Sequence, residues 1–594
     1  MREVEVPVLI MGGGGCGMSA SSFLSEMGVE HLLVERHSET SHLPKAHYLN
    51  QRTMEIFRGF GMADPIYEVG APLENFGHIR WVTSLGGDGP YDRRDFHEFD
   101  AFGGGVLKAP YEKDGPALPS NLPQIRLEPL LRKMAEERSG GRGEVVKFGH
   151  EIVEWEDTDA GIVATVLDRA ADERFIVRAR YMIAADGGKT VVPKLGTPML
   201  GPTGMLEMVS THFKADLSEY VDDKSMITWS INPEGEGSWS SGALVKMGPT
   251  WDRHSEEWVI HFAFRPDDPA RFDEAAIVPR MRELLKIPDL DLEVLKVSHW
   301  ILDRIHAEKF RIGNVFLAGD SAHRQPPTTG LGLNGAIHDA HNLCWKLAEV
   351  VSGRADDSLL DTYEAERLPV GADNADWALS AFTNFAVIDV AMGLMPGAPK
   401  EQNMAAFAAF FADTRLGASI RGRFAEVINT QRVEFHAHEI EIGYNYDSAA
   451  VVPDGTDMPV RDPFGSVYKP TTRPGHRLPH AWIERDGRRL STHDLITPGT
   501  FALIAGADGA EWLKAASAVA DELGVKIDAV TIGGTVSDVD GQWAEVGGLE
   551  PGGAVLVRPD QHTAWRTQEV PTDPAAALRT AFDAVLGKAA VPSA

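Results

Sequence analysis

Two glycine-rich stretches have residue types and spacing suited to binding a nucleotide. The first, Gly12 to Gly17, fits the pattern G-x-G-x-x-G and directly follows an apolar run, Val6 to Met11. Glycines at such a turn let a pyrophosphate approach the N-terminus of the next helix, where free N–H groups and the helix dipole favour anions. Glu35 ends a second apolar run, where a carboxylate can bind a ribose 2′-OH. The stretch predicts a dinucleotide site without separating FAD from NAD.

The second stretch begins with an apolar run, Val315 to Ala318, that leads into Gly319 and Asp320. Gly319 lets the backbone pass close to a ligand, and Asp320 faces that ligand from the end of a strand. Residues 330–335 also fit G-x-G-x-x-G, but a prolyl loop separates them from their strand and no second strand with a terminal acid follows. We interpret them as a loop whose amides, at a helix N-terminus, point toward an electron-rich ring edge.

Hydrophobic periodicity predicts the elements that position these motifs. A strand, a helix and a second strand over residues 6–34 form a βαβ unit, which implies a parallel sheet. Residues 75–120, rich in Gly, Asp and Pro, are expected to be loops. The other expected elements are antiparallel strands at 152–155, 162–167 and 175–179, a β-rich second sheet over 205–300, a strand at 315–318, a helix at 335–351, helical connections over 395–455, and an α/β unit from about 456.

The order of the motifs resembles the group A flavoprotein monooxygenases, with the p-hydroxybenzoate hydroxylase-like fold. Between the two glycine motifs, Ala184 to Val192 is similar to that family's Asp-Gly motif, although Lys189-Thr190 replaces the usual Arg-Ser. Four further stretches resemble the phenol hydroxylase branch, and especially the chlorophenol (2,4-dichlorophenol) 6-monooxygenases: Pro44–Glu55, Leu360–Arg367, Thr472–Trp482 and Leu556–His562.

The resemblance implies an α/β fold in which a Rossmann-like FAD-binding domain is interleaved with a β-rich substrate domain. A thioredoxin-like α/β domain is expected at the C-terminus. Since it has no CxxC motif, it is expected to stabilise the protein, dimerise it or cover the active site. The expected boundaries are 1–200 and 301–390 for the FAD-binding domain, 201–300 for the substrate domain, 391–455 for a helical connection and 456–594 for the C-terminal domain.

The resemblance also implies a reaction. In this family NAD(P)H reduces FAD, O2 adds to form a flavin C4a-hydroperoxide, and the distal oxygen attacks an activated phenol ring, ortho to the hydroxyl when a catechol forms. His47 is the expected activating base, because a histidine with a pKa of about 6.5 can accept a phenol proton near neutrality. Yeast-type phenol hydroxylases have an aspartate at that place. A purely structural role for His47 is the alternative.

The remaining expected site residues fall into groups by the part of the ligands they would contact. Core packing is the alternative for the two proposed pocket residues, Trp229 and His261. The groups are Gly12, Gly14, Gly17, Glu35 and Arg36 for the ADP half; Lys45 near the pyrophosphate and the nicotinamide cofactor; Gln124 and Asp186 beside the flavin; Gly319 and Asp320 at the ribityl chain; and Pro327 with Gly330, Gly332, Leu333 and Asn334 around the isoalloxazine.

Composition narrows the possible partners. The net charge of −30, spread along the chain, argues against binding to nucleic acid or to an anionic membrane. The only two cysteines, Cys16 and Cys344, lie in no metal-ligand spacing, so neither a metal site nor a redox-active disulfide is expected. No basic, apolar leader opens the sequence, and the cytoplasm is the expected location. A homodimer is the family expectation.

Two alternatives to a phenol hydroxylase remain open at this point. One is a monooxygenase that acts on a larger polycyclic aromatic in secondary metabolism, since residues 205–300 would set the size of the pocket. The other is a flavin reductase or flavin-binding protein without oxygenase activity. The choice between NADPH and NADH is also open, because the family has no separate nucleotide-binding fold for the reductant.

Overall fold

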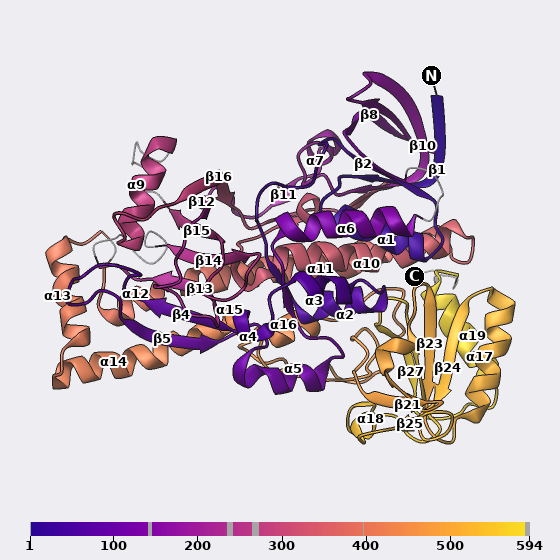
Figure 1. Ribbon diagram of the computed structural model, residues 1–594. Coiled ribbons are helices and arrows are strands. Elements are labelled where there is room, and N and C mark those ends of the chain that lie inside the picture. The colour runs from indigo at the N-terminus through magenta and orange to yellow at the C-terminus, as the bar shows by residue number, and fades with distance from the viewer. Residues whose placement is uncertain (1, 140–144, 234–241, 264–272, 396, 589–594) are drawn as a thin grey trace.

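The computed structural model describes residues 2–139, 145–233, 242–263, 273–395 and 397–588. Two large sheets dominate the first 330 residues, and long helices run through the middle of the molecule between them (Figure 1). A smaller α/β unit follows at the C-terminus. None of the described helices is long and apolar enough to cross a membrane.

The first sheet has the order β18-β19-β10-β1-β2-β7, with β8 and β9 added along β10. β1 pairs in parallel with both β2 and β10, as the predicted βαβ unit requires. The three predicted antiparallel strands are also confirmed, since β9 pairs antiparallel with β8 and β10. The strands are β1 (Arg2–Met11), β2 (His31–Glu35), β7 (Val146–Phe148), β8 (His150–Thr158), β9 (Gly161–Asp168), β10 (Glu173–Ala184), β18 (Arg311–Ile312) and β19 (Val315–Leu317).

The second sheet has the order β16-β12-β15-β14-β13-β4-β5. Its first five strands confirm the β-rich sheet predicted over 205–300, with helix α9 (Glu274–Leu285) among them. The prediction of loops over 75–120 is wrong, because this segment supplies β4 and β5 to the sheet. The strands are β4 (His78–Val82), β5 (Asp95–Asp100), β12 (Leu206–Lys214), β13 (Ser225–Ser230), β14 (Ala243–Gly248), β15 (Glu257–Ala263) and β16 (Glu293–Leu302).

The two faces of the second sheet pack against different partners. Val209, Leu244 and Ile260 share one face and form a separate core with residues of α9. Trp229 and Val245 belong to the other face, which joins the large core shared with the first sheet. Side chains on this inner face therefore point toward the domain that carries the glycine motifs.

Helices connect the two sheets and set the position of the loops between them. The most central are α1 (Gly15–Glu26), α2 (Gln51–Gly59), α6 (Gln124–Arg138), α10 (Leu331–Val351) and α11 (Asp361–Asn384). The predicted helix at 335–351 begins four residues earlier, at Leu331, so it includes all but the first residue of the G-x-G-x-x-G pattern at 330–335. The expected helical connection is formed by α12 (Ala386–Met392), α13 (Lys400–Phe411), α14 (Arg415–Ile428), α15 (Arg432–Phe435) and α16 (His438–Ile442).

The C-terminal unit contains the elements that were expected after residue 456. Its main sheet has the order β24-β23-β26-β27, flanked by α17 (Ala510–Leu523) and α19 (Pro574–Val585). The thioredoxin-like assignment stays a prediction. The strands are the hairpin β21 (Trp482–Arg485) and β22 (Arg488–Ser491), followed by β23 (Thr500–Ala505), β24 (Lys526–Thr531), β26 (Ala554–Val557) and β27 (Thr563–Thr567).

Candidate active site

The first glycine stretch forms a tight turn between β1 and α1. A Cβ added at Gly17 would lie 2.0 Å from the carbonyl oxygen of Gly12, so only glycine allows the helix to pack this close to the strand. A Cβ added at Gly14 would meet only Glu128 Oε1, at 3.9 Å, which leaves open space above the turn. The backbone N–H of Gly13 donates to Glu35 Oε2 over 2.8 Å, so the acid that was expected to bind a ribose lies beside the turn.

Two helix N-termini meet at this turn. Helices α1 and α10 both begin without a side-chain cap and without an acidic residue in the first turn. The Cys16 thiol donates to the carbonyl of Ala336 over 3.2 Å, and a Cβ at Gly15 would lie 2.7 Å from Leu333 Cδ1. The helices are thus in contact at their first turns, where their free N–H groups and dipoles create a local positive potential.

Asp186 joins the Asp-Gly motif to the second glycine stretch. Its carboxylate accepts hydrogen bonds from the backbone N–H groups of Thr190 (2.7 Å) and Val191 (3.1 Å) and from the Ser321 hydroxyl (2.9 Å). Ser321 Oγ also accepts from the N–H of Gly188. The predicted flavin contact of Asp186 is untested, and the contacts seen here give its carboxylate a positioning role.

Asp320 is exposed at the end of β19, and none of the described residues donates a hydrogen bond to its carboxylate. The neighbouring Gly319 is held in place, because its N–H donates to Asp339 Oδ2 over 3.0 Å. Asp339 is buried and pairs with both Arg367 and His323. Within the stretch Leu360–Arg367, Arg367 and Glu366 are buried, whereas Asp361 is exposed.

The prolyl loop that precedes α10 is held by a hydrogen bond to the Asn334 side chain, while part of it is exposed. Pro327 is exposed, and Gly330 takes a left-handed backbone (φ 66°) that leads into α10. The Asn334 side chain donates to the carbonyls of Gly330 and Tyr48 and accepts from the N–H of Asn50. A Cβ at Gly332 would meet nothing within 4 Å. Asn334 thus connects the second glycine stretch to the chain segment that carries His47.

His47 lies next to a residue that the sequence analysis missed. The two-residue strands β3 (Tyr48–Leu49) and β6 (Ser120–Asn121) pair, and this places His47 Nδ1 2.6 Å from Asn121 Oδ1. An amide oxygen only accepts hydrogen bonds, so Nδ1 carries the proton and Nε2 is left as a proton acceptor. Burial lowers the pKa of His47, while its hydrogen bond with Asn121 opposes that shift.

Trp229 and His261 lie in one row across the inner face of the second sheet. Register pairs Trp229 with Ala243 and Ala243 with His261, so all three side chains point the same way. Trp229 packs on Phe385, with ring centroids 4.5 Å apart. His261 Nδ1 lies 2.7 Å from Ser210 Oγ. Burial and the nearby His47 lower the pKa of His261 to about 4.

The other expected cofactor residues lie near the glycine turn or at the surface. Gln124 accepts from the N–H of Ala46 over 3.2 Å and donates to Glu128 Oε1 over 2.8 Å. Arg36 and Lys45 are exposed, and Lys45 has a left-handed backbone (φ 49°). Direct contact of these residues with a ligand remains a prediction.

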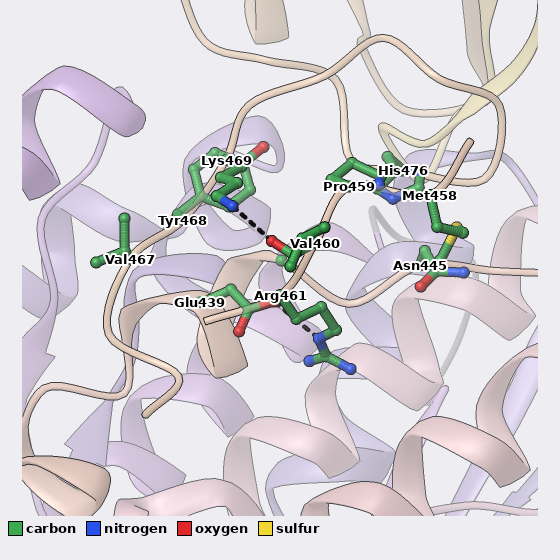
Figure 2. Close-up of a pocket in the computed structure, with 11 residues that line it drawn as sticks. Glu439, Asn445, Met458, Pro459, Val460, Arg461, Val467, Tyr468, Lys469 and His476 are labelled. Carbon is green, nitrogen blue, oxygen red and sulfur yellow. Dashed lines mark hydrogen bonds and ion pairs between the residues drawn. The ribbon is translucent and has the colours of Figure 1, made fainter. Parts of the chain in front are cut away.

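A surface pocket lies elsewhere, between α16 and the segment 445–476 (Figure 2). Glu439 and Arg461 form an ion pair across it, and Lys469 Nζ donates to the carbonyl of Val460. None of the predicted site residues lines this pocket. No group of three or more potential metal ligands lies among the described residues.

These features fit FAD. The turn at Gly14 leaves room for a pyrophosphate, and the two free helix N-termini favour its negative charge. Contact of Glu35 and Asp320 with the cofactor stays a prediction. Fold and site together define an FAD-binding oxidoreductase.

Comparison with known proteins gives the family. Residues 5–378 match the FAD binding domain family, and residues 471–589 match the family described as aromatic-ring hydroxylase, C-terminal. The chain belongs to the FAD-dependent aromatic-ring hydroxylases and is an FAD-dependent aromatic monooxygenase.

Three similar proteins illustrate the range of this family. The chain is 33% identical to a 2,4-dichlorophenol 6-monooxygenase of Delftia acidovorans, over 98% of each chain. It is 35% identical to a tetracenomycin A2 monooxygenase-dioxygenase of Streptomyces glaucescens, over 99% of this chain and 98% of the other. The structure of the flavin-dependent monooxygenase PieE in complex with FAD and substrate superposes with a TM-score of 0.90, at 35% identity, covering 99% of this chain and 100% of PieE.

Proposed function

We propose that the protein hydroxylates a phenolic aromatic at the ortho position, with NAD(P)H as reductant and O2 as oxidant. The balanced reaction converts the phenol, NAD(P)H, H⁺ and O2 into the catechol, NAD(P)⁺ and water. The observation that carries the proposal is the His47–Asn121 pair, which leaves His47 Nε2 as a free proton acceptor deep in the protein, close to His261 on the inner face of the substrate sheet.

The chain's own residues would activate and shield the substrate. His47 Nε2 accepts the phenol proton, and the resulting phenolate pushes electron density to the ortho carbon. Asn121 Oδ1 holds the ring in the required tautomer and stabilises the imidazolium once it forms. Trp229, packed on Phe385, supports the aromatic ring. When bound, FAD would supply the redox chemistry that links NAD(P)H to O2.

The amides at the start of α10 and the exposed Pro327 would lie along the isoalloxazine. The free N–H groups of the helix N-terminus are suited to the electron-rich edge of the ring. Glu35 and Asp320 would hold the ribose and the ribityl chain. These assignments rest on the open space at Gly14 and Gly332 and on the free carboxylate of Asp320.

NADPH and NADH oxidation by the purified FAD-loaded protein tests the proposal. The rate is measured with and without phenol and 2,4-dichlorophenol, and products are analysed. Faster oxidation together with a catechol product is the expected result. A yellow protein whose NAD(P)H oxidation no phenol accelerates, and which forms no catechol, contradicts the proposal.

A second candidate is hydroxylation of a larger polycyclic aromatic. It is favoured by the match to PieE and by the relative named for tetracenomycin A2, which is as similar as the dichlorophenol enzyme. 1-Naphthol and 1-hydroxyanthraquinone, tested in the same assay, separate the two candidates by their kcat/KM relative to phenol.

We also propose a homodimer and a cytoplasmic location, where NAD(P)H is supplied. The homodimer follows the expectation for this family. Sedimentation velocity of the FAD-loaded protein at micromolar concentration tests it, and a single species of 64.7 kDa would contradict it.

A further inference from the structure

The inner face of the substrate sheet carries a hydrogen-bonded chain that the proposed reaction does not use. Trp300 Nε1 donates to Ser210 Oγ over 2.8 Å, and Ser210 Oγ lies 2.7 Å from His261 Nδ1. Register pairs Ser210 with His261, so both side chains share the face that Trp229 also occupies. The three residues come from three neighbouring strands, β16, β12 and β15, which fixes the direction of the imidazole.

These hydrogen bonds favour one tautomer of His261. Ser210 Oγ accepts the indole N–H, and its own hydroxyl hydrogen is then available to His261 Nδ1. When the hydroxyl donates to Nδ1, the single N–H of the neutral imidazole is on Nε2. His261 thus presents a hydrogen-bond donor at the end of its ring, whereas the neighbouring His47 presents an acceptor.

His47 and His261 lie close to one another at the inner face of the sheet. Both residues are half-buried; burial lowers the pKa of each, and the nearby His47 also lowers that of His261. Ala243 lies between Trp229 and His261 in the row and is the smallest of the three side chains. A substrate placed against His47 would therefore have its other side near His261.

We propose that His261 is a specificity-determining residue that donates a hydrogen bond from Nε2 to a second oxygen of the aromatic substrate. The inference rests on the proposed phenol hydroxylation and names the substrate class within it. The preferred substrate has one phenolic hydroxyl, which gives its proton to His47, and a second hydroxyl or carbonyl oxygen that accepts from His261. Ser210 and Trp300 are positioning residues, because they act on the substrate through His261.

The test compares selectivity rather than activity alone. Values of kcat and KM are measured for phenol, catechol, resorcinol and hydroquinone with the wild type and with His261→Phe, His261→Gln and Ser210→Ala. We expect the wild type to prefer at least one diol, and His261→Phe to lower its kcat/KM ratio for that diol over phenol about tenfold, mainly through KM. His261→Gln, which keeps an N–H donor, should recover part of that ratio, and Ser210→Ala should lower it.

A matched control is Thr211→Val, which removes a hydroxyl from the next residue of β12, on the opposite face of the sheet. Its selectivity ratio should equal that of the wild type, and FAD absorbance shows that each variant is folded and loaded. A wild type that hydroxylates phenol but prefers no diol, or a ratio unchanged in His261→Phe, overturns the inference and leaves the proposed function intact. A wild type that hydroxylates neither phenol nor any diol overturns both.

Discussion

His47 and Asn121 form the hydrogen bond on which the proposed proton transfer depends. Two features make the pair suited to that role: the amide oxygen leaves Nε2 unprotonated, and burial lowers the pKa of the ring. A lowered pKa means that the free base persists at a pH where an exposed histidine would already be protonated. Activity that depends on this base should therefore hold below pH 6.5 and fall only at more acidic pH.

Replacing His47 tests this role directly. His47→Ala should retain FAD, because no contact of the imidazole is shared with the glycine turn, and should lower kcat with phenol about 100- to 10,000-fold. The acidic limb of the pH–rate profile should disappear with the base. Steady-state kinetics between pH 5 and 9 measure both effects, and an unchanged profile would remove His47 from the mechanism.

A substitution at Asn121 should raise the pKa of His47, whereas burial lowers it in the wild type. In Asn121→Asp a carboxylate accepts the hydrogen bond from Nδ1–H, and its negative charge stabilises the imidazolium, so the pKa of His47 rises. Since activity requires the unprotonated Nε2, the acidic limb should move to higher pH by about one unit or more. The double variant His47→Ala/Asn121→Asp is the control, and the limb should not move in that background. An acidic limb that stays at its wild-type pH in Asn121→Asp would contradict the assignment of His47 as the base.

At the scale of helices and strands, the sequence pattern predicted those elements that residues adjacent in the chain determine. The turn of Gly12 to Gly17 lies between β1 and α1 as expected, because an apolar run, a glycine turn and an amphipathic stretch are contiguous in the sequence. Strands β4 and β5 were missed, because both are short and flanked by Gly-rich segments. β4 pairs with β13, which is more than 120 residues away, and among the described strands β5 pairs only with β4.

The same distinction applies to the site. His47 and Asp320 were predicted as site residues from sequence motifs, whereas Asn121 and Ser210 were not. Asn121 reaches His47 only because two-residue strands pair across about 70 residues of chain, and Ser210 meets His261 only through the register of β12 and β15. Partners fixed by long-range pairing leave no local signal in the sequence.

Gly14 and Gly17, both in the first glycine turn, should respond differently to replacement by alanine. Gly14→Ala adds a Cβ into open space, so the apoprotein should keep its stability while FAD affinity falls at least tenfold, because the methyl group occupies the approach of the pyrophosphate. Gly17→Ala adds a Cβ 2.0 Å from the Gly12 carbonyl oxygen, so it should destabilise the apoprotein itself. Thermal unfolding without FAD and FAD titration separate the effects. Equal FAD affinity in Gly14→Ala and wild type would contradict the proposed site.

At the scale of the whole molecule, a buried charge cluster connects the C-terminal unit to the rest. Arg558 pairs with Glu366 on α11 and with Asp560, and Lys346 on α10 also pairs with Glu366, with all four side chains almost fully buried. Arg52 on α2 donates to the carbonyl of Asp560 over 2.8 Å. Helices α2, α10 and α11 are therefore fixed to the C-terminal unit by buried charged groups.

Breaking this cluster should cost far more than breaking an exposed pair. Arg558→Met leaves two buried carboxylates, Glu366 and Asp560, with only Lys346 for compensation, and should lower the free energy of unfolding by about 3–5 kcal/mol. Arg485→Met removes a half-exposed pair with Asp528 in the same unit and should cost about 1 kcal/mol or less.

Acidic pH should weaken the same buried charge cluster. Arg558 and Lys346 hold the pKa of Glu366 at about 2, below its usual value near 4.5, although burial alone would raise it. The carboxyl of Glu366 therefore contributes stability above about pH 4.5, and this contribution is lost as the pH falls toward 2. Arg558→Met removes the larger of the two favourable charges, so its stability should depend less on pH than that of the wild type over this range. Urea unfolding of both proteins between pH 3 and 7 measures the difference, and parallel curves would show that the ion pairs do not govern the acid response.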